Sequence, residues 1–525
     1  MNFKWILFAF PVAIGLFLLL KYGTQLVDDG YYYLQIAWHV AHGHGFTFDG
    51  IHHTNGFHPL WQLVLVPFFW FFEEKFLVTY LVSVLQLLLY ALSGWLIYRA
   101  VYRQTIKESV ALFAMAMMLL NVWFFFKGAM TGMETAIVLL LLGTILIKLN
   151  DPQNEILRFG MILMLLVAAR LEMIVFVVAI SFFVPIYLKQ KKIVYAGLFA
   201  ALYLGAYFVS NNFFFNHLFP ISGTIKTYRG RERLLEFITG ESTRFWDHLS
   251  DNLTALLTLN TFDIKIGLFL LFFFSIYYIW IYFHAETRLR LFILIILGTT
   301  TVMVLSYSAL YGNVLETWKY YWLPVLYLNI FLFSCSLTLL SSRLRRVLML
   351  CLTGLTLLFS WIYFTDMKRT ILFQISYSEH PRHEMVAYIN QNLPEHAILG
   401  SWDAGYLGYY CQRTLINLDG LVNNYEIVPY LRNNDMNAYI DKKGIDYLVN
   451  QNLNLDNDRW RLEHTKSIKI PAAHKLTTFS VNPRYIDVAK KYDIEYNLYK
   501  KVKNNNAGRQ QSQPLELPGE GIETK

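Results

Sequence analysis

The sequence has few charged residues and few cysteines for its length. Of its 525 residues, 16% are charged and 55% are hydrophobic. A soluble globular protein has about 25% charged residues, so the composition excludes that class and indicates a polytopic membrane protein. The three cysteines, Cys335, Cys351 and Cys411, are too few and too scattered for a disulfide framework or a cysteine metal site.

Two further absences limit the function and the topology. The net charge of +8 does not indicate nucleic-acid binding, because the basic residues lie in short loops and in the C-terminal region rather than on one polar patch. The first apolar run, 3–20, has no small-residue cleavage site after it, so we interpret it as a retained helix and not as a signal peptide. The segment 24–74 lacks Lys and Arg but carries six histidines, His39, His42, His44, His52, His53 and His58.

Apolar runs of membrane-spanning length predict the topology. A membrane helix needs about 20 apolar residues, and the segment 59–72 is apolar but shorter. If 59–72 lies in the interface, the basic loops gather on one side, as the positive-inside rule requires. We therefore expect a multi-pass protein of the cell (inner) membrane, with a cytoplasmic N-terminus and an external C-terminus. It has about eleven spans, near 3–22, 76–98, 109–126, 133–149, 157–169, 171–188, 193–215, 264–283, 291–311, 319–340 and 346–364.

The composition changes after residue 365, where the long apolar runs end. A helix-like segment at 384–392 and strand-like segments at 397–401, 414–417 and 447–450 predict an α/β domain. The expected fold class is an α-helical polytopic membrane protein with a C-terminal external α/β domain. We expect a transmembrane domain at 1–365 with external loops at 24–75 and 216–263, the second with an amphipathic helix, then the external domain at 370–502 and a disordered tail at 503–525.

Two adjacent acids, Asp28 and Asp29, follow the first span. A carboxylate at a membrane surface loses hydration, so its presence there needs a compensating cause. An acid pair at this position can act as a base on a substrate that is in the bilayer or anchored to it. The alternative is that Asp28 is the N-cap of a surface helix that runs to about Ala41, and the two roles can coexist.

The residues around this pair resemble a known class of enzymes. The run Asp28-Asp29-Gly-Tyr-Tyr-Tyr, with Gly43-His-Gly45 and Thr54-Asn-Gly-Phe-His58-Pro59-Leu-Trp61 after it, is similar to GT-C glycosyltransferases. Bacterial members include arabinofuranosyl-, aminoarabinose and mannosyltransferases. The resemblance covers about the first 230 residues and extends loosely to the later spans. It implies a polyprenyl-phosphate sugar as donor, an acceptor glycan, lipid or protein in the cell envelope, and a reaction outside the membrane among membrane lipids.

The resemblance also implies a set of site residues. An acceptor hydroxyl that attacks the anomeric carbon must lose a proton, and in the family the first acid is the base, which matches Asp28. Asp29 and Glu134 would line the same cavity, and a divalent metal, which only some relatives hold, would bind these three acids. The leaving phosphate needs cations or donors, for which the candidates are His58, Arg170, Lys226 and Arg229. The sugar or acceptor would contact Tyr32, Trp61 and Tyr320.

These residues also have structural explanations. His58 stands where relatives have a lysine, and it can be an interfacial histidine without a ligand. A carboxylate such as Glu134 is favoured at a helix N-terminus, and Arg170 can form an ion pair with Glu172. The basic residues of the second external loop can contact lipid headgroups, and surface Trp and Tyr can be belt anchors.

Two short motifs in the C-terminal region are interpreted as strand-end turns. They are Ser401-Trp402-Asp403-Ala-Gly405 and Asn417-Leu-Asp419-Gly420. Their residues carry no chemistry that would identify an acceptor site.

Three classes of function can be compared on this basis. A lipid-linked-sugar flippase or transporter would place ionisable residues at mid-membrane in broken helices. Here the candidates cluster at the outer face, which favours an enzyme. A scaffold that only presents the external domain leaves the acid pair unexplained. The sequence therefore predicts a hexosyl- or pentosyltransferase that works on the external side of the membrane.

Overall fold

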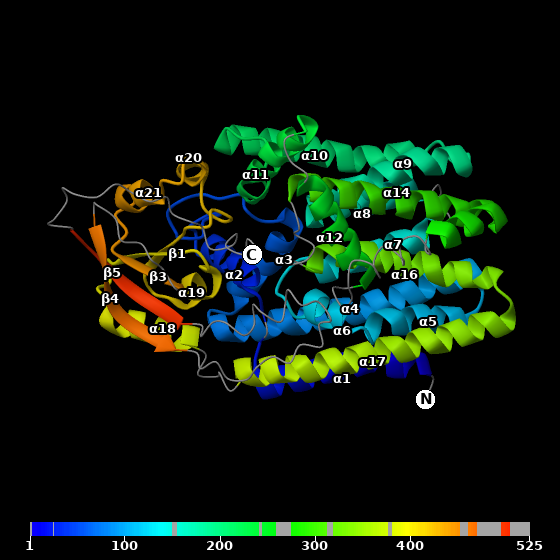
Figure 1. Ribbon diagram of the computed structural model, residues 1–525, viewed down its shortest axis with the longest axis horizontal. Helices are drawn as coiled ribbons and strands as arrows, with labels where there is room; N and C mark the ends of the chain where they lie inside the picture. Colours follow the sequence, from blue (N-terminus) through cyan, green and yellow to red (C-terminus); the bar gives the residue numbers. More distant parts are fainter. Residues whose placement is uncertain are drawn as a thin grey trace.

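The protein combines a bundle of apolar helices with an α/β unit at one end of the bundle (Figure 1). The long helices lie roughly side by side along the longest axis of the molecule. Helices α2 (Asp28–Ala41) and α3 (Pro59–Phe71) lie between the bundle and the α/β unit. The computed structural model describes residues 3–24, 26–149, 155–240, 244–258, 275–311, 319–375, 381–451, 460–469 and 495–503.

The helices of the bundle follow the apolar runs of the sequence. Most of them are apolar all round, as expected for helices that contact both lipid and other helices. They are α1 (Phe3–Tyr22), α4 (Lys75–Thr105), α5 (Glu108–Leu119), α6 (Val122–Phe124), α7 (Thr135–Lys148), α8 (Ile156–Ala169), α9 (Ile174–Tyr187), α10 (Ile193–Phe215), α14 (Thr287–Leu310), α16 (Leu323–Ser336) and α17 (Ser342–Ile375). Residues 275–284 are also helical, and most of the expected span at 264–283 lies outside the described residues.

Helix length establishes some of the expected membrane crossings. Within the described ranges, six helices are long and apolar enough to cross a membrane, or seven if α5 and Val122–Ala129 form one bent span. The 14-residue helices α7, α8 and α9 are only about 21 Å long, less than a hydrocarbon core of about 30 Å. The chain is thus a membrane protein with several spanning helices. The lengths of its helices alone do not establish the eleven spans that the sequence predicted.

The expected span at 109–126 is broken. The chain turns by 54° between α5 and Val122–Ala129. Asn121 caps the second part, because its side chain accepts hydrogen bonds from the amides of Trp123 and Phe124. This part ends in a π-helix, η1 (Phe125–Ala129). The following loop then reaches α2, where the amide of Val27 donates to the carbonyl of Thr131 at 3.1 Å.

The two expected external loops contain further helices. Helix α3 has 13 residues and is about 20 Å long, too short to cross a membrane alone. The second loop holds α11 (Ile221–Ile238) and α12 (Arg244–Thr258), where the sequence predicted one amphipathic helix. Helix α12 packs against α14 of the bundle.

The α/β unit has a mixed five-stranded sheet in the order β2-β1-β3-β5-β4. Strand β1 pairs in parallel with β2 and β3, whereas β5 is antiparallel to β3 and β4. The strands are β1 (Ile398–Ser401), β2 (Thr414–Asn417), β3 (Tyr447–Gln451), β4 (Trp460–Lys469) and β5 (Glu495–Lys503), with helices α18 (Pro381–Asn392), α19 (Gly405–Tyr410), α20 (Val428–Arg432) and α21 (Met436–Lys442). Short 3-10 helices are η3 (Leu171–Met173), η4 (Lys319–Trp322), η5 (Leu337–Leu339) and η6 (Tyr425–Ile427). The expected tail, apart from residue 503, lies outside the described residues.

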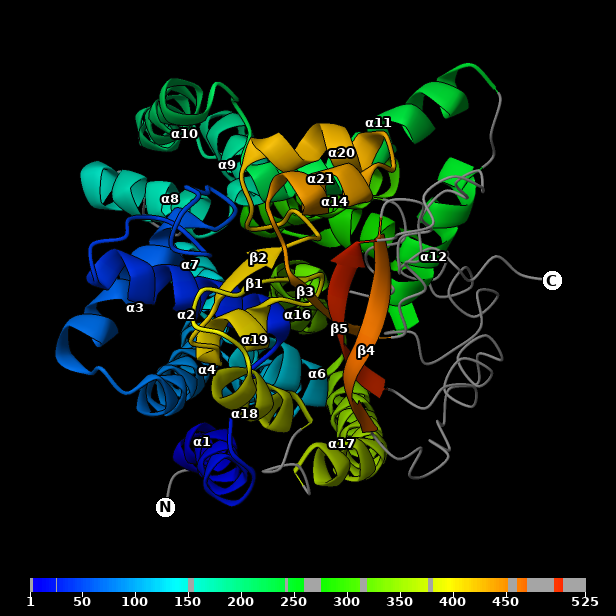
Figure 2. The same ribbon diagram turned by 90° about the vertical axis from the view of Figure 1, so that its left-hand side faces the viewer.

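The α/β unit shares a hydrophobic core with the first external loop. Tyr32 and Ile36 of α2 belong to the same buried cluster as Leu399 of β1 and Leu407 of α19. Figure 2 shows α19 lying over α2 when the molecule is viewed from the sheet end. The burial of these apolar side chains therefore joins the unit to the end of the bundle.

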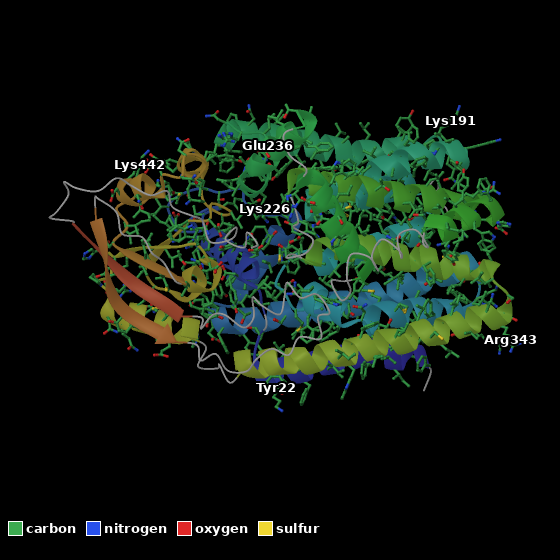
Figure 3. The ribbon with its side chains drawn as sticks, viewed as in Figure 1. Tyr22, Lys191, Lys226, Glu236, Arg343 and Lys442 are labelled. Carbon is green, nitrogen blue, oxygen red and sulfur yellow. The ribbon has the colours of Figure 1, made fainter. Side chains whose placement is uncertain are left out.

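Charged residues mark the two ends of the bundle (Figure 3). Lys191 and Arg343 lie at the end remote from the α/β unit. Lys226 lies at the junction, and Tyr22, the last residue of α1, lies at the same end as the junction. These two basic residues thus share one end of the bundle.

Candidate active site

A pocket opens at the junction between α2, α11, the loop before α7 and the α/β unit. The hollow has a volume of about 480 Å³, which includes open solvent at its mouth. Acids, bases and tyrosine rings gather in it: Asp29, Glu134, His58, Lys226, Tyr32, Tyr33, Tyr320 and Tyr321. The bundle and the α/β unit both contribute to the lining, since Leu421 and Val422 follow strand β2.

Asp29 enters this pocket from the first turn of α2. The hydroxyl of Tyr320 donates to its Oδ2 at 3.3 Å. Burial raises the pKa of the Asp29 carboxyl; Lys226 opposes that shift, and Asp28 adds to it. A carboxylate with a raised pKa beside open space can accept a proton from a bound hydroxyl.

Glu134 is a buried carboxylate at the start of α7, with a side chain that is 0% exposed. The hydroxyl of Tyr33 donates to its Oε2 at 3.1 Å. Glu134 occupies the N-cap position of α7, but its side chain makes no capping hydrogen bond. Glu134 thus stands at a helix N-terminus, as expected, but its side chain does not bond to that helix. The side chain contacts residues around the pocket instead.

Arg170 pairs with two acids. Its Nε is 2.8 Å from Oε1 of Glu172 and 3.7 Å from Oε1 of Glu134. Its guanidinium lies over the ring of Tyr321 at 4.5 Å. The ion pair with Glu172 that we considered as the structural explanation is thus present. Arg170 does not line the pocket, so the expected contact with a donor phosphate lacks support.

His58 is the N-cap residue of α3 and lines the pocket. Its Nε2 is 3.8 Å from Oε1 of Glu134. Its Nδ1 is buried and makes no hydrogen bond in the described part of the chain. A buried nitrogen without a partner costs free energy.

Lys226 of α11 lines the same pocket. Its Nζ donates to the hydroxyl of Tyr321 at 3.1 Å. Burial lowers the pKa of Lys226, but Tyr321 and Asp29 more than offset burial and leave this pKa raised. The ammonium is therefore charged at neutral pH. The backbone of Arg229 belongs to α11, and its side chain lies outside the described residues.

Asp28 does not cap its own helix. The N-cap of α2 is Val27, so that expectation was wrong. The Asp28 carboxylate instead accepts hydrogen bonds from the amides of Gly405 at 2.8 Å and Tyr406 at 3.0 Å, the first two residues of α19. Asp28 does not line the pocket, and its carboxylate is held by amides of another segment. The role of base therefore has better geometric support at Asp29.

The three expected aromatic residues have different surroundings. Tyr320 lines the pocket and contacts Asp29. Tyr32 also lines it, with its hydroxyl donating to Oδ2 of Asp419 at 2.9 Å. Trp61 is 0% exposed, and its Nε1 donates to the carbonyl of Gly132 at 2.8 Å. The prediction that Trp61 contacts the sugar was therefore wrong, because no face of its ring is accessible.

Asp419 adds a carboxyl behind Tyr32. Burial raises the pKa of Asp419 to about 7, against the opposing effect of its hydrogen bonds. Its Oδ1 accepts a hydrogen bond from the amide of Leu421 at 2.7 Å, and Gly420 has a φ of +84°. These contacts form the turn that the sequence predicted at 417–420.

Nine of the fifteen lining residues were not among the predicted site residues, and four of the nine show why. Tyr33 and Tyr321 stand next to Tyr32 and Tyr320, so their adjacency was a signal, but a run of tyrosines does not show which ring faces inward. Leu421 and Val422 are ordinary apolar residues nearly 400 positions from α2 and carry no local signal. Only the docking of the α/β unit brings them to the pocket.

In the described part of the chain, the three acids expected to bind a metal do not form a metal site. Among the residues that the structure describes, no group of three or more His, Cys, Asp or Glu side chains is placed to hold a metal ion. Asp28 is engaged by backbone amides, and Glu134 lies beside a guanidinium. A divalent cation at Asp28, Asp29 and Glu134 would have to displace these donors, so the surroundings do not fit one.

Comparisons with known proteins support the fold. Residues 370–503 match a family described as a domain of unknown function (DUF8728). The comparison with curated proteins finds no match. A crystal structure of the oligosaccharyltransferase from Archaeoglobus fulgidus, tethered to an acceptor peptide, is similar, with a TM-score of 0.50 and 12% identity. The similarity covers 86% of this chain and 69% of that chain. At this identity the likeness concerns the fold alone.

Proposed function

We propose that the chain is an integral-membrane glycosyltransferase that moves one sugar from a polyprenyl phosphate to an acceptor on the external side of the membrane. The observation that carries this proposal is the pocket itself, in which the Asp29 carboxylate and the Lys226 ammonium lie together. The fold of an oligosaccharyltransferase supports the same class of reaction. Asp29 replaces Asp28 as the proposed base.

The proposed reaction is a direct displacement with inversion. The acceptor hydroxyl attacks the anomeric carbon, its proton passes to Asp29, and the new C–O bond forms. The bond between the anomeric carbon and the phosphate oxygen breaks, and the phosphate leaves with the electron pair. Lys226 stabilises the negative charge of the leaving phosphate, and His58 can donate to it. Tyr320 orients Asp29 through its hydrogen bond.

The test of this function is the analysis of cells that lack the protein. Mass spectrometry of lipid-linked sugars and envelope glycans should show one polyprenyl-phosphate sugar that accumulates and one glycan that loses a sugar mass. Restoring the wild-type gene should reverse both changes. Unchanged lipid and glycan profiles would reject the proposed activity.

A flippase for lipid-linked sugars is the second candidate, and the broken span favours it. Discontinuous helices are typical of transporters, and Lys127 lies half-buried in the π-helix η1. The acids and bases of the pocket, however, lie at the end of the bundle and not in this break. A flippase would keep its lipid transport when Asp29 is replaced, whereas the enzyme would lose transfer.

Lys226→Met is expected to weaken binding of polyprenyl phosphate about ten- to a hundredfold, because a charge-assisted hydrogen bond to the phosphate is lost. Titration of the purified protein with undecaprenyl phosphate, followed by tryptophan fluorescence, measures this change. Lys191→Met, at the far end of the bundle (Figure 3), is the matched control and should bind normally. Equal affinity of the Lys226 variant and the wild type would remove Lys226 from the phosphate site.

The proposed sidedness makes a separate prediction. A reporter that is active only outside the cytoplasm should be active when fused after residue 370 and silent when fused at residue 104. The reason is that α4 would carry the chain from the external α3 to the cytoplasmic end. Activity at 104 would show that α3 crosses the membrane and that the proposed external site is assembled incorrectly.

A further inference from the structure

The short helix α19 of the α/β unit is held at its N-terminus by Asp28. The first amides of a helix have no partner within the helix, and the N-cap residue Ala404 offers no side-chain hydrogen bond. The two oxygens of Asp28 accept from the amides of Gly405 and Tyr406. A carboxylate is also favourable there because the N-terminus of a helix carries partial positive charge. Asp28 therefore caps the N-terminus of α19, although it belongs to a different segment of the chain.

The C-terminal end of α19 is held by Lys75, which like Asp28 lies outside the α/β unit. The Nζ of Lys75, the first residue of α4, donates to the carbonyl of Tyr409 at 2.5 Å and to Oε1 of Gln35 at 2.9 Å. The hydroxyl of Tyr409 donates back to the carbonyl of Lys75 at 2.7 Å. A cation is favourable at a helix C-terminus. An acid and a base from outside the α/β unit thus hold both ends of α19.

Two glycines let the backbones meet at this contact. A Cβ on Gly405 would lie 2.1 Å from the carbonyl oxygen of Asp28, and a Cβ on Gly30 would lie 2.4 Å from that of Thr131. The first turn of α2 is therefore pressed between α19 on one side and the loop before α7 on the other. A side chain at either glycine would push the segments apart.

This contact bears on the pocket because Asp28 and Asp29 are consecutive. Successive residues of an α-helix point about 100° apart, so fixing Asp28 against α19 sets the direction of Asp29. The same docked unit supplies Leu421 and Val422 to the pocket. The carbonyl of Leu421 lies so close to Gly56 that a Cβ there would be 2.0 Å away. Docking of the α/β unit thus determines both the direction of the acid and part of the lining.

We propose that Asp28 is a positioning residue, which holds α19 on the first turn of α2 and thereby sets Asp29 in the pocket. The proposal rests on the proposed function only for its effect on transfer. The other part of the proposal, that α19 orders the first turn of α2, does not depend on any activity. Asp28 itself does not line the pocket.

The test compares full-length Gly405→Ala, Asp28→Asn and the control Gly205→Ala, which has no neighbouring atom within 4 Å of the added Cβ. Hydrogen exchange of peptides covering 403–410 and 26–34 measures order in α19 and in the first turn of α2. In Gly405→Ala both peptides should exchange about tenfold faster, because the hydrogen bonds to the charged carboxylate are lost. Asp28→Asn keeps one accepting oxygen and should lie between this variant and the wild type.

Turnover supplies the second measurement. In Gly405→Ala the kcat for transfer should fall about tenfold or more through misplacement of the base, while the affinity for undecaprenyl phosphate changes little, since Lys226 lies on α11. Faster exchange in 403–410 with unchanged exchange in 26–34 or unchanged kcat would overturn the positioning role. If the wild type transfers no sugar, the proposed function fails, and exchange in 26–34 alone still decides whether α19 orders α2.

Discussion

Asp29→Asn is expected to reduce sugar transfer by about 10²–10⁴, the usual contribution of a positioned general base. Asparagine keeps the size of the side chain and can still accept the hydrogen bond from Tyr320, but it cannot take a proton. Binding of undecaprenyl phosphate should survive, because the phosphate is assigned to Lys226 and His58. Turnover and lipid affinity, measured on the same purified variant, separate a loss of chemistry from a loss of binding.

The pH dependence of the wild type provides the control for this prediction. The base works in its ionised form, and burial raises the pKa of Asp29. Transfer should therefore be lost as the pH falls through this raised pKa, so that the acid limb lies above about pH 4, the ordinary value for Asp. Asp28→Asn removes a charge that helps to raise the pKa of Asp29, so this substitution should move the acid limb to lower pH.

Near-normal transfer by Asp29→Asn would exclude Asp29 as the base.

Arg170→Met is expected to lower the free energy of unfolding by about 3–5 kcal/mol, because it leaves the buried carboxylate of Glu134 and the half-buried one of Glu172 without their cation. The Arg170 side chain is 1% exposed and lies between Glu134 at 0% and Glu172 at 26% exposure. Methionine keeps much of the volume, so the effect reports charge more than packing. Denaturant unfolding in detergent, followed by circular dichroism, measures the loss.

A second substitution distinguishes the cause of this destabilisation. Arg170→Met combined with Glu172→Gln should recover part of the lost stability, since one of the unpaired charges is removed. Arg158→Met is the matched control, because the Arg158 side chain is 72% exposed and should matter little for unfolding. An equal loss in the single and double variants would show that Arg170 stabilises the protein through packing rather than through charge.

The roles of the two acids show why the pocket could be located from the sequence but not assigned residue by residue. The position after the first span predicted that acids would lie at the end of the bundle, and the structure has them there. Adjacent residues of a helix face different directions, however, and the partners of Asp28 are Gly405 and Tyr406, more than 370 positions away. No local pattern indicates which acid meets them.

Trp61 shows the same limit for apolar residues. Helix α3 is apolar all round, so its sequence has no side that marks the interior. An interfacial tryptophan and a buried one are then indistinguishable from the sequence. The ring is buried because the loop before α7 returns to α2 and presents the carbonyl of Gly132 to its Nε1. That return depends on the break between α5 and the π-helix.

The sequence by itself determined where most of the apolar helices of this protein lie. Apolar runs of spanning length become helices because a buried or lipid-facing segment must satisfy its own backbone hydrogen bonds, and α1 and α10 have the expected bounds, 3–22 and 193–215. The tertiary structure alone decided which carboxylate faces the pocket, which tryptophan is buried and how Leu421 and Val422 join the lining. These outcomes depend on contacts between segments hundreds of residues apart, which form through close packing of particular surfaces and leave no trace in local periodicity.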